Sequence, residues 1–571
     1  MIEHDEERPV MRIDTDLARA SQQANWSWSI FCSVIAFISC IVVMITPLER
    51  RVGTTLLAPL PTSRWLAILG AWLPANFHWL PNARDSFVST NNLEFLFLVA
   101  LAFVIYGLAA LLLFRLPANA NYRGIQRLIW AVTTVVGLLL VFAPAMLSHD
   151  LFVYADYGHT LVIYHTNLYF VPPATISHDQ ITQLDDWRTS TAAYGPFWLY
   201  ISALIAIVAG NHPLRYIMAF RLLGFAAHLV NTWLVLRILR TSGRSPRIVT
   251  LGVLLYALNP LALLESCMGA HNDATMVTFI LLGILLSMRA EQRGFTYFTS
   301  YAPPAIAFTL AVLIKFTSIP LILFFLALLA RKSILASSAL ALHHKSQVWQ
   351  SALFKILLVG LLCAGLVLLF YIPFWLGHRL TAILLSFSAP PSAWLAENSI
   401  LRAAQGWIHL HGLSARNSWM YRPLVLLSNH LTWTILNLIV LPCATLFGIV
   451  RLWHSPTPHM FTLAALVTFG ALLLVTPWFF AWYVIWLVAL AAVLLTRPGN
   501  PAQYALIAFA LAFSICAFFS YLDNGSPLLS RAGYLQCLRI FGIPVLVFLV
   551  VLLIEWRMNF KSEVKAPSKD A

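Results

Sequence analysis

Long runs of apolar residues recur along the whole chain, and they limit its possible folds more than any other feature. Because a bilayer needs about 20 apolar residues for each helical span, we expect transmembrane helices where these runs are long enough. With 60% hydrophobic and only 10% charged residues, the chain is unsuited to a soluble fold. The sequence therefore predicts an all-α polytopic membrane protein of about fourteen spans, at residues 26–47, 93–114, 128–147, 216–236, 248–264, 274–288, 302–314, 317–330, 353–376, 423–450, 461–476, 483–496, 502–520 and 536–556.

Basic residues indicate the orientation of these spans. The loops 115–127 and 237–247 and the C-terminal tail are rich in Lys and Arg, so the positive-inside rule predicts that they face the cytoplasm. If the run 197–210 also spanned, loop 237–247 would fall outside. This run is short, and we predict that it forms a helix along the outer interface. The polar N-terminus precedes a long apolar run, so we expect no secretory signal. Both termini are predicted to be cytoplasmic, and the chain a multi-pass plasma-membrane protein.

The acidic residues sort to one side of this predicted topology. Acids have little influence on topology, so the sorting is independent evidence that any chemistry takes place outside. We expect the outer surface to consist mainly of the loops 48–92, 148–215 and 377–422. Between the N-terminal tail and the last span, only Glu291 falls inside, whereas the outer acids are Glu49, Asp85, Glu94, Asp150, Asp156, Asp179, Asp185, Asp186, Glu265, Asp273, Glu397 and Asp523.

Several classes of function are disfavoured. The net charge of +14 is scattered between the spans, which favours contact with anionic lipid headgroups over nucleic acid. None of the seven cysteines is spaced as a CxxC pair, and most lie in apolar runs. A disulfide framework or zinc site is therefore not expected. No phosphate-binding glycine motif indicates a soluble nucleotide domain. The chain has no repeat of 20–50 residues, which weakens the inverted-repeat plan of many transporters.

Polar side chains gather where the third predicted span ends, in the stretch MLSHDLFVYADYGHTLVIYHTNLYFVPP (146–173). In one interpretation, Ser148 or Asp150 only caps an interfacial helix that begins at Leu151. In the other, Asp150 lies at the edge of a low-dielectric region, where its raised proton affinity suits a general base acting on a hydroxyl. The density of further polar groups in this stretch is typical of a sugar-binding surface.

Two further segments carry candidate site residues. The short loop ESCMGAHNDATM (265–276) holds one His and two acids, which are costly so close to hydrocarbon unless they have a function. A turn with Asn272 or Asp273 as helix cap is the simpler interpretation. The stretches AAYGPFWLY (192–200) and TPWFFAWYVIW (476–486) are rich in aromatic residues, which suit either an interfacial belt or the faces of sugars.

Two cations interrupt apolar runs on the outer side. Arg221 lies near the outer end of the fourth span, and Lys315 lies at a predicted outer turn. Each side chain either extends to the membrane surface or binds an anionic headgroup such as a phosphate. Arg188 is a weaker candidate.

Four short motifs, in the same order, resemble those of membrane-embedded GT-C glycosyltransferases, and most of all the bacterial mannosyltransferases that use polyprenol-phosphate mannose. The first motif consists of SHDLFVYADYG together with TNLYFVPP, and it is similar to the catalytic-loop signature of that family. AYGPFWLY, ESCMGAHNDA and FFAWYVIW are similar to its later elements. The resemblance covers about residues 128–490.

The resemblance implies transfer of a hexose, by analogy mannose, from a polyprenyl-phosphate sugar to an acceptor hydroxyl, with inversion. The acceptor would be a glycan, glycolipid or protein. Asp150 is expected to be the general base, Arg221 and Lys315 to bind phosphate, and His271 and Asp273 to orient a substrate. No metal is required, although Asp150, Asp185 and Asp273 would suit a divalent cation if they folded together. The remaining expected substrate-binding residues are Tyr154, Asn167, Tyr169, Tyr194, Asn272, Trp482 and Tyr483.

We expect a cytoplasmic tail (1–25), a two-span extension (26–127), a catalytic membrane module (128–496), C-terminal spans (497–556) and a second tail (557–571). Two alternatives remain open. A flippase for lipid-linked sugars, or an ion-coupled transporter, would use the acids and His as proton carriers. A structural assembly subunit would not need the outer acids.

Overall fold

The structure is a computed structural model. It describes residues 29, 32–44, 92–143, 146–176, 178–339, 345–386, 396–411, 419, 421–495, 500–521 and 533–565. The predicted tail 1–25 and almost all of the predicted outer loop 48–92 lie outside the described residues, and the loop 377–422 is described only in part.

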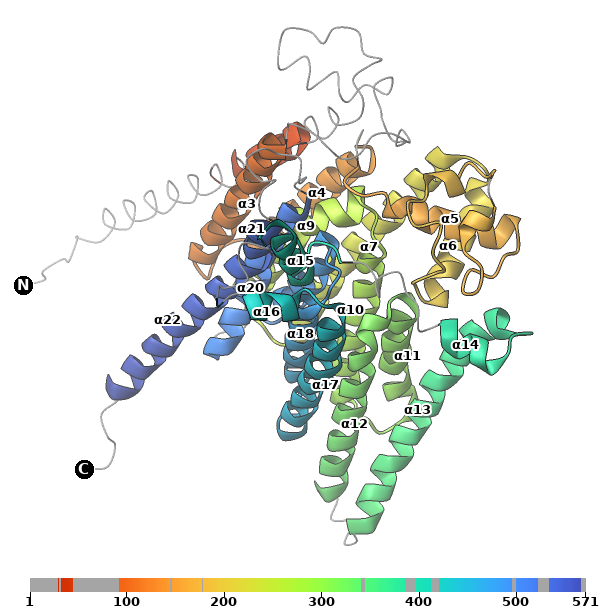
Figure 1. Cartoon of the computed structure of the whole chain (residues 1–571). Coiled ribbons are helices and arrows are strands. Elements are labelled where there is room, and N and C mark those ends of the chain that lie inside the picture. Colours follow the sequence, from red (N-terminus) through yellow and green to blue (C-terminus); the bar gives the residue numbers. More distant parts are fainter. Residues whose placement is uncertain are drawn as a thin grey trace, which may run out of the picture.

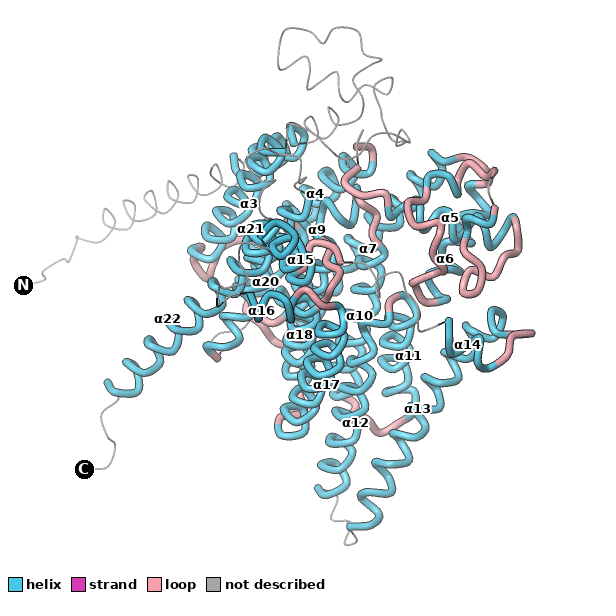
Figure 2. The backbone as a smooth tube through the Cα atoms, viewed as in Figure 1, coloured by secondary structure: helices cyan, strands magenta, loops and turns pink. Residues whose placement is uncertain are grey.

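Helices make up most of the described chain, as Figure 2 shows. Ten of them, some extended by an adjoining short helix, are long and apolar enough to cross a membrane. The all-α polytopic fold predicted from the sequence is therefore confirmed. These ten are α3 (Asn92–Arg115), α4 (Tyr122–Val141), α7 (Pro213–Thr241), α10 (Asn272–Gln292), α12 (Ile319–Ala339), α13 (Lys345–Trp375), α17 (His430–His454), α18 (Pro458–Val475), α20 (Pro501–Cys516) and α22 (Ile543–Lys565).

A bent pair of helices would make an eleventh span if the two cross the membrane together. The helices α8 (Pro246–Ala257) and α9 (Pro260–Leu263) meet at a bend of 51°, and α9 continues into the π-helical turn η5 (Leu264–Met268). Three other predicted spans correspond to shorter apolar helices, which are Cys32–Met44, α11 (Phe298–Ile314) and α19 (Val484–Val493). The count of fourteen stays a prediction, because length and composition identify ten or eleven spans among the described residues.

The depth of burial separates inner from outer helices. Every residue of α19 is buried, and so is 67% of the most apolar window of α10. By contrast, only 11% of the most apolar window of α13 is buried, and only 17% of that of α17. The exposed Leu and Phe side chains of these two helices suit contact with lipid. Figure 1 shows α10, α12, α13, α17 and α18 extending in one general direction. The core therefore centres on α10 and α19.

Two short helices form a group at one end of this bundle (Figure 1). They are α5 (Asp150–Ile163) and α6 (Pro196–Ala209), joined by a loop with the 3₁₀ turns η3 (Pro173–Thr175) and η4 (Thr182–Leu184). A side chain at Gly158 would lie 2.1 Å from the Ser202 carbonyl oxygen, so glycine allows α5 to pack closely on α6. Pro196 occupies the first turn of α6, where proline is favoured because its missing N–H is not needed there. That α6 lies along the membrane interface stays a prediction.

The remaining helices are short. Beyond α13, the chain forms α14 (Leu380–Ser386), α15 (Ile400–His411) and α16 (Tyr421–Leu427). The 3₁₀ turn η6 (Phe316–Ser318) precedes α12, and η8 (Ala481–Tyr483) precedes α19. The turn η9 (Ala517–Tyr521) follows α20, and α21 (Gly533–Cys537) with the π turn η10 (Leu538–Gly542) precedes α22. In the described chain, strand-like pairing is limited to one isolated bridge between Glu397 and Trp478.

Candidate active site

A cavity of about 300 Å³ opens where the α5–α6 group meets the bundle. Its wall combines one carboxylate and one ammonium group with many aromatic rings. This mixture is typical of sites that bind a partly apolar ligand and orient it through a few polar groups. The lining residues are Asp150, Val153, Tyr157, Trp187, Ala193, Tyr194, Lys315, Phe316, Thr317, Leu472, Leu473, Thr476, Trp478, Phe480, Tyr483 and Trp486.

Asp150 is the first residue of α5, and its side chain is 14% exposed at the cavity. The helix therefore begins one residue earlier than expected, and His149 occupies the capping position without a side-chain cap bond. The backbone N–H of Asp150 donates to Ser148 Oγ over 3.2 Å, whereas the carboxylate is not used as a cap. Burial raises the pKa of Asp150 above its ordinary value, and the nearby His271 and Lys315 partly offset this increase.

His271 lies between two carboxyl groups. Its Nδ1 atom is 3.9 Å from Asp150 Oδ2, and its Nε2 atom is 3.2 Å from Glu265 Oε2. Tyr521 in η9 donates a hydrogen bond of 2.7 Å to the other oxygen of Glu265. The imidazole is also stacked on Trp482, with ring centroids 3.8 Å apart. Neither ring nitrogen forms a hydrogen bond within the described residues, so the stack on Trp482 and the nearby Glu265 carboxylate are what place the ring beside Asp150.

The backbone around His271 is irregular. Glu265 lies in the π turn η5, and Ala270 has a φ of 56°, which is uncommon for residues other than glycine. A side chain at Gly269 would lie 2.7 Å from the His271 ring, so glycine is needed there. Such π turns and left-handed residues occur often at functional sites. Here they bring Glu265 and His271 together.

Lys315 follows α11 and points into the cavity, with its side chain 12% exposed. Its Nζ atom forms an ion pair of 2.8 Å with Asp273 Oδ1, which also accepts a hydrogen bond of 2.6 Å from Trp486 Nε1. The ammonium group lies 4.2 Å from the Tyr483 ring centroid and 5.9 Å from that of Tyr194. Gly195 N–H donates to the Ile314 carbonyl oxygen, which holds the Tyr194 segment beside this lysine.

Arg221 does not lie on the cavity lining. Its side chain is fully buried in α7, where it donates hydrogen bonds to the carbonyl oxygens of Met268, Val141 and Ala143. The guanidinium therefore joins the end of α4 to the end of η5, just before His271. This geometry favours a structural role over direct contact with phosphate.

Four other predicted site residues do not line the cavity, and three of them are buried, whereas Asn167 is half-buried. Tyr154 packs against the rings of Tyr194 and Trp198, and Asn272 is fully buried at the start of α10. Asn167 donates to the Phe374 carbonyl oxygen, and Tyr169 donates to the Tyr194 carbonyl oxygen over 2.8 Å. The last two contacts tie the loop after α5 to α13 and to the cavity wall. The predicted site residues thus divide into those that line the cavity and those that support its wall.

The three aspartates considered as metal ligands do not come together. Asp273 is paired with Lys315, and Asp185 lies against the carboxyl group of Asp156. In the part of the chain that the structure describes, no group of three or more His, Cys, Asp or Glu residues has the geometry to hold a metal ion.

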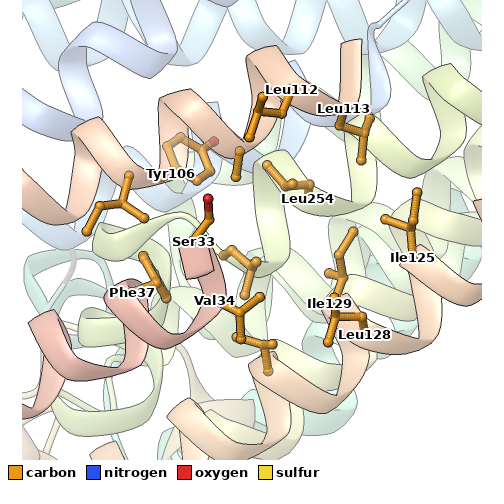
Figure 3. Close-up of a pocket in the computed structure, with 14 residues that line it drawn as sticks. Ser33, Val34, Phe37, Tyr106, Leu112, Leu113, Ile125, Leu128, Ile129 and Leu254 are labelled. Atoms are coloured by element: carbon orange, nitrogen blue, oxygen red, sulfur yellow. The ribbon is translucent and has the colours of Figure 1, made fainter. Parts of the chain in front are cut away.

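A separate small cavity of about 50 Å³ lies between residues 33–37, α3, α4 and α8 (Figure 3). Its wall is almost wholly aliphatic. The hydroxyl groups of Ser33 and Tyr106 donate to backbone carbonyl oxygens, so neither is available for chemistry. This cavity does not carry the groups that a catalytic site requires.

Sequence reasoning missed three kinds of site residue. Glu265 belonged to a recognised cluster, but nothing in the sequence paired it with His271. Trp478, Phe480 and Trp486 belonged to an aromatic run that an interfacial belt explained equally well. Trp187 follows two acids in an irregular loop, and its only signal was the tripeptide Asp-Asp-Trp on the predicted outer side.

Comparisons with known proteins agree with the motifs. Residues 62–331 match the family model described as the N-terminal domain of alpha-(1->6)-mannopyranosyltransferase. The chain is 30% identical over 158 residues to alpha-(1->6)-mannopyranosyltransferase A of Corynebacterium glutamicum, covering 26% of this chain and 30% of that protein. A probable alpha-(1->6)-mannopyranosyltransferase of Mycolicibacterium smegmatis is 29% identical over 154 residues, or 26% of this chain and 27% of that protein.

A longer match is to an alpha-(1->6)-mannopyranosyltransferase of Mycobacterium tuberculosis, with 26% identity over 430 residues and 68% of each chain covered. No solved structure matches the chain. The chain spans less than a third of the length of the first two of these relatives. These matches confirm the resemblance to bacterial mannosyltransferases that the motifs indicated.

Proposed function

We propose that this protein transfers mannose from a polyprenyl-phosphate donor to an acceptor hydroxyl on the outer face of the plasma membrane. The observation that carries the proposal is the shared cavity of Asp150 and Lys315, a base and a cation on one wall. The relatives are named alpha-(1->6)-mannopyranosyltransferases, which supports mannose as the sugar.

In this reaction, the acceptor oxygen attacks the anomeric carbon of mannose as Asp150 takes the hydroxyl proton. The bond between the anomeric carbon and the phosphate oxygen breaks, and the polyprenyl phosphate leaves with the bonding electrons. Attack from the face opposite the leaving group inverts the configuration, so a β-linked donor gives an α-linked product. General-base catalysis of this kind contributes about 10²- to 10⁴-fold to a rate.

Lys315 is suited to the departing phosphate because a preorganised cation stabilises charge that develops in the transition state. Its partner Asp273 and the rings of Tyr483 and Trp486 hold the ammonium group in place. His271 lies close enough to Asp150 to stabilise its carboxylate and to influence its proton affinity. Glu265, in turn, pairs with His271, and Tyr521 donates a hydrogen bond to Glu265.

The test is sugar transfer by the purified full chain in proteoliposomes. We expect radiolabelled mannose to move from polyprenyl-phosphate mannose, but not from a nucleotide sugar, to a synthetic mannoside acceptor. The product should be cleaved by an α-mannosidase. Movement of the intact donor across the bilayer without a new glycosidic bond would instead indicate the flippase alternative.

A further inference from the structure

A row of aromatic rings runs along the cavity from its outer loop to His271. The centroids of Trp187 and Trp478 are 5.0 Å apart, those of Trp478 and Phe480 are 5.3 Å apart, and those of Phe480 and Trp482 are 4.4 Å apart. Trp482 is stacked on His271, which faces Asp150. Trp482 and His271 are buried behind the cavity lining, so the rings that face the cavity end at Phe480, and the row as a whole ends at His271 beside the proposed general base.

The first three rings, Trp187, Trp478 and Phe480, line the cavity and are only half-buried. Belt residues in a membrane protein anchor it by facing lipid headgroups. Trp187 and Trp478 instead pack against each other at an interplanar angle of 58° and both line the cavity, although they come from distant parts of the chain. An interfacial belt does not explain this arrangement.

The backbone under both tryptophans is held in place. Asp185 Oδ1 accepts a hydrogen bond of 2.6 Å from Trp187 N–H, and Asp186 pairs with His149, next to Asp150. On the other side, Glu397 bonds to the backbone of Pro477 and Phe479, which flank Trp478. Rings with a fixed backbone lose little conformational entropy when they bind a ligand.

The rings of this row differ from those around Lys315. The ammonium group lies near Tyr194, Tyr483 and Trp486, none of which belongs to the row. The two sets adjoin, since the centroids of Phe480 and Tyr483 are 5.9 Å apart. The cavity thus offers a charged subsite for a phosphate and, beside it, a long aromatic subsite. The apolar face of a pyranose ring, which carries C–H groups, packs well on an indole or phenyl face.

We infer that Trp187, Trp478 and Phe480 form the platform for the acceptor, and that the acceptor is a glycan of at least two sugar residues. Its terminal hydroxyl lies at Asp150, and the sugar residues behind it lie along the row toward Trp187. This inference rests on the proposed function for the identity of the reaction. The platform itself is a binding site whose occupancy is measurable without any transfer.

The experiment compares octyl α-mannosides of one to four sugar residues as acceptors for the full chain in detergent. We expect the acceptor KM of the wild type to fall about tenfold as the acceptor lengthens. Trp187→Ala and Trp478→Ala should lose most of that decrease, and Trp187→Phe should keep part of it. Trp419→Ala is the matched control, because Trp419 is 84% exposed and does not line the cavity. It should retain the full length dependence.

Saturation-transfer NMR without donor separates this inference from the proposed function. Contact of the four-sugar acceptor with the wild type, weakened by Trp187→Ala, supports the platform even if no mannose is transferred. Conversely, transfer with a KM that is independent of acceptor length, or a length dependence that survives both alanine variants, would overturn the platform and leave the proposed function standing.

Discussion

Nδ1 of His271 lies 3.9 Å from Oδ2 of Asp150, although the two residues come from separate segments of the chain. The contact depends on the bent helix pair that ends at η5, because the π turn and the left-handed Ala270 redirect the chain just before His271. Glu265, which lies within that turn, holds the far side of the imidazole. One local irregularity therefore brings the candidate base and its neighbours together.

The orientation of His271 should matter for turnover. We expect His271→Ala to reduce kcat most and Glu265→Gln to reduce it roughly 10- to 100-fold, because a displaced catalytic group is costly. Tyr521→Phe should have a smaller effect of about fivefold, since it removes one hydrogen bond to Glu265. Steady-state assays of the three variants give the ranking. An unchanged kcat in Glu265→Gln would mean that Glu265 does not orient the ring.

Lys315 should act through its charge. Lys315→Met is expected to lower kcat/KM about 100-fold, because the departing phosphate loses its cation, whereas Lys315→Arg should retain part of the activity. Inhibition by added polyprenyl phosphate should weaken in parallel. Lys332, which pairs with Glu291 outside the cavity, provides the matched control, and Lys332→Met should behave as wild type. Equal losses in both methionine variants would contradict this role.

The pH dependence of transfer follows from the buried carboxylate. Burial raises the pKa of Asp150 above 3.8. The base form is lost as the pH falls through this raised pKa, so the acid limb of kcat/KM should lie above pH 3.8. A profile of kcat/KM against pH, measured under conditions where the protein stays folded, tests this. An acid limb at or below the ordinary carboxyl range would argue against a buried catalytic carboxylate.

The buried carboxyl groups of Asp156 and Asp185 should affect stability rather than catalysis. Burial, together with the charge of Asp156, raises the pKa of Asp185 to about 9. Folding therefore takes up a proton between about pH 4 and pH 9, and this pair makes the fold less stable as the pH rises through that window. Asp185→Asn removes the penalty and keeps the oxygen that bonds to Trp187. We expect its Tm to exceed that of the wild type by about 2 °C at pH 8, and by less at pH 5.

The predicted topology has its own test. Gln180 and Ser242 are both exposed in the structure, and the topology places them on opposite sides of the membrane. In intact cells, Gln180→Cys should react with an impermeant thiol reagent, and Ser242→Cys should react only after the membrane is made permeable. Labelling of both residues, or of Ser242→Cys alone, in intact cells would contradict the topology.

The sequence predicted the class of fold because a membrane span needs only local hydrophobicity, which can be read residue by residue. It also predicted that Asp150, His271, Asp273 and Lys315 belong to one site, since charged groups beside apolar runs are costly unless they have a function. It did not predict the role of Arg221, because sequence does not indicate whether a buried guanidinium meets a ligand or the carbonyl oxygens at helix ends.

Other parts of the site depend on tertiary contacts that leave no local pattern. The partner of His271 is decided by a π turn, and the aromatic row joins a loop tryptophan to residues nearly 300 positions later. Trp187 does not belong to a segment with the periodic hydrophobic pattern of a helix or strand. Trp478 belongs to an aromatic stretch that a membrane belt explains equally well. Only the contact between Trp187, in the loop after α5, and Trp478, just beyond α18, distinguishes these possibilities.

The most direct test of the account is mannosyl transfer by Asp150→Asn in proteoliposomes supplied with polyprenyl-phosphate mannose and a mannoside acceptor. The amide keeps the shape of the side chain but cannot take the hydroxyl proton, so we expect transfer to fall at least about 100-fold. Monodispersity and Tm should match those of the wild type. Near-normal transfer by this folded variant would contradict Asp150 as the general base.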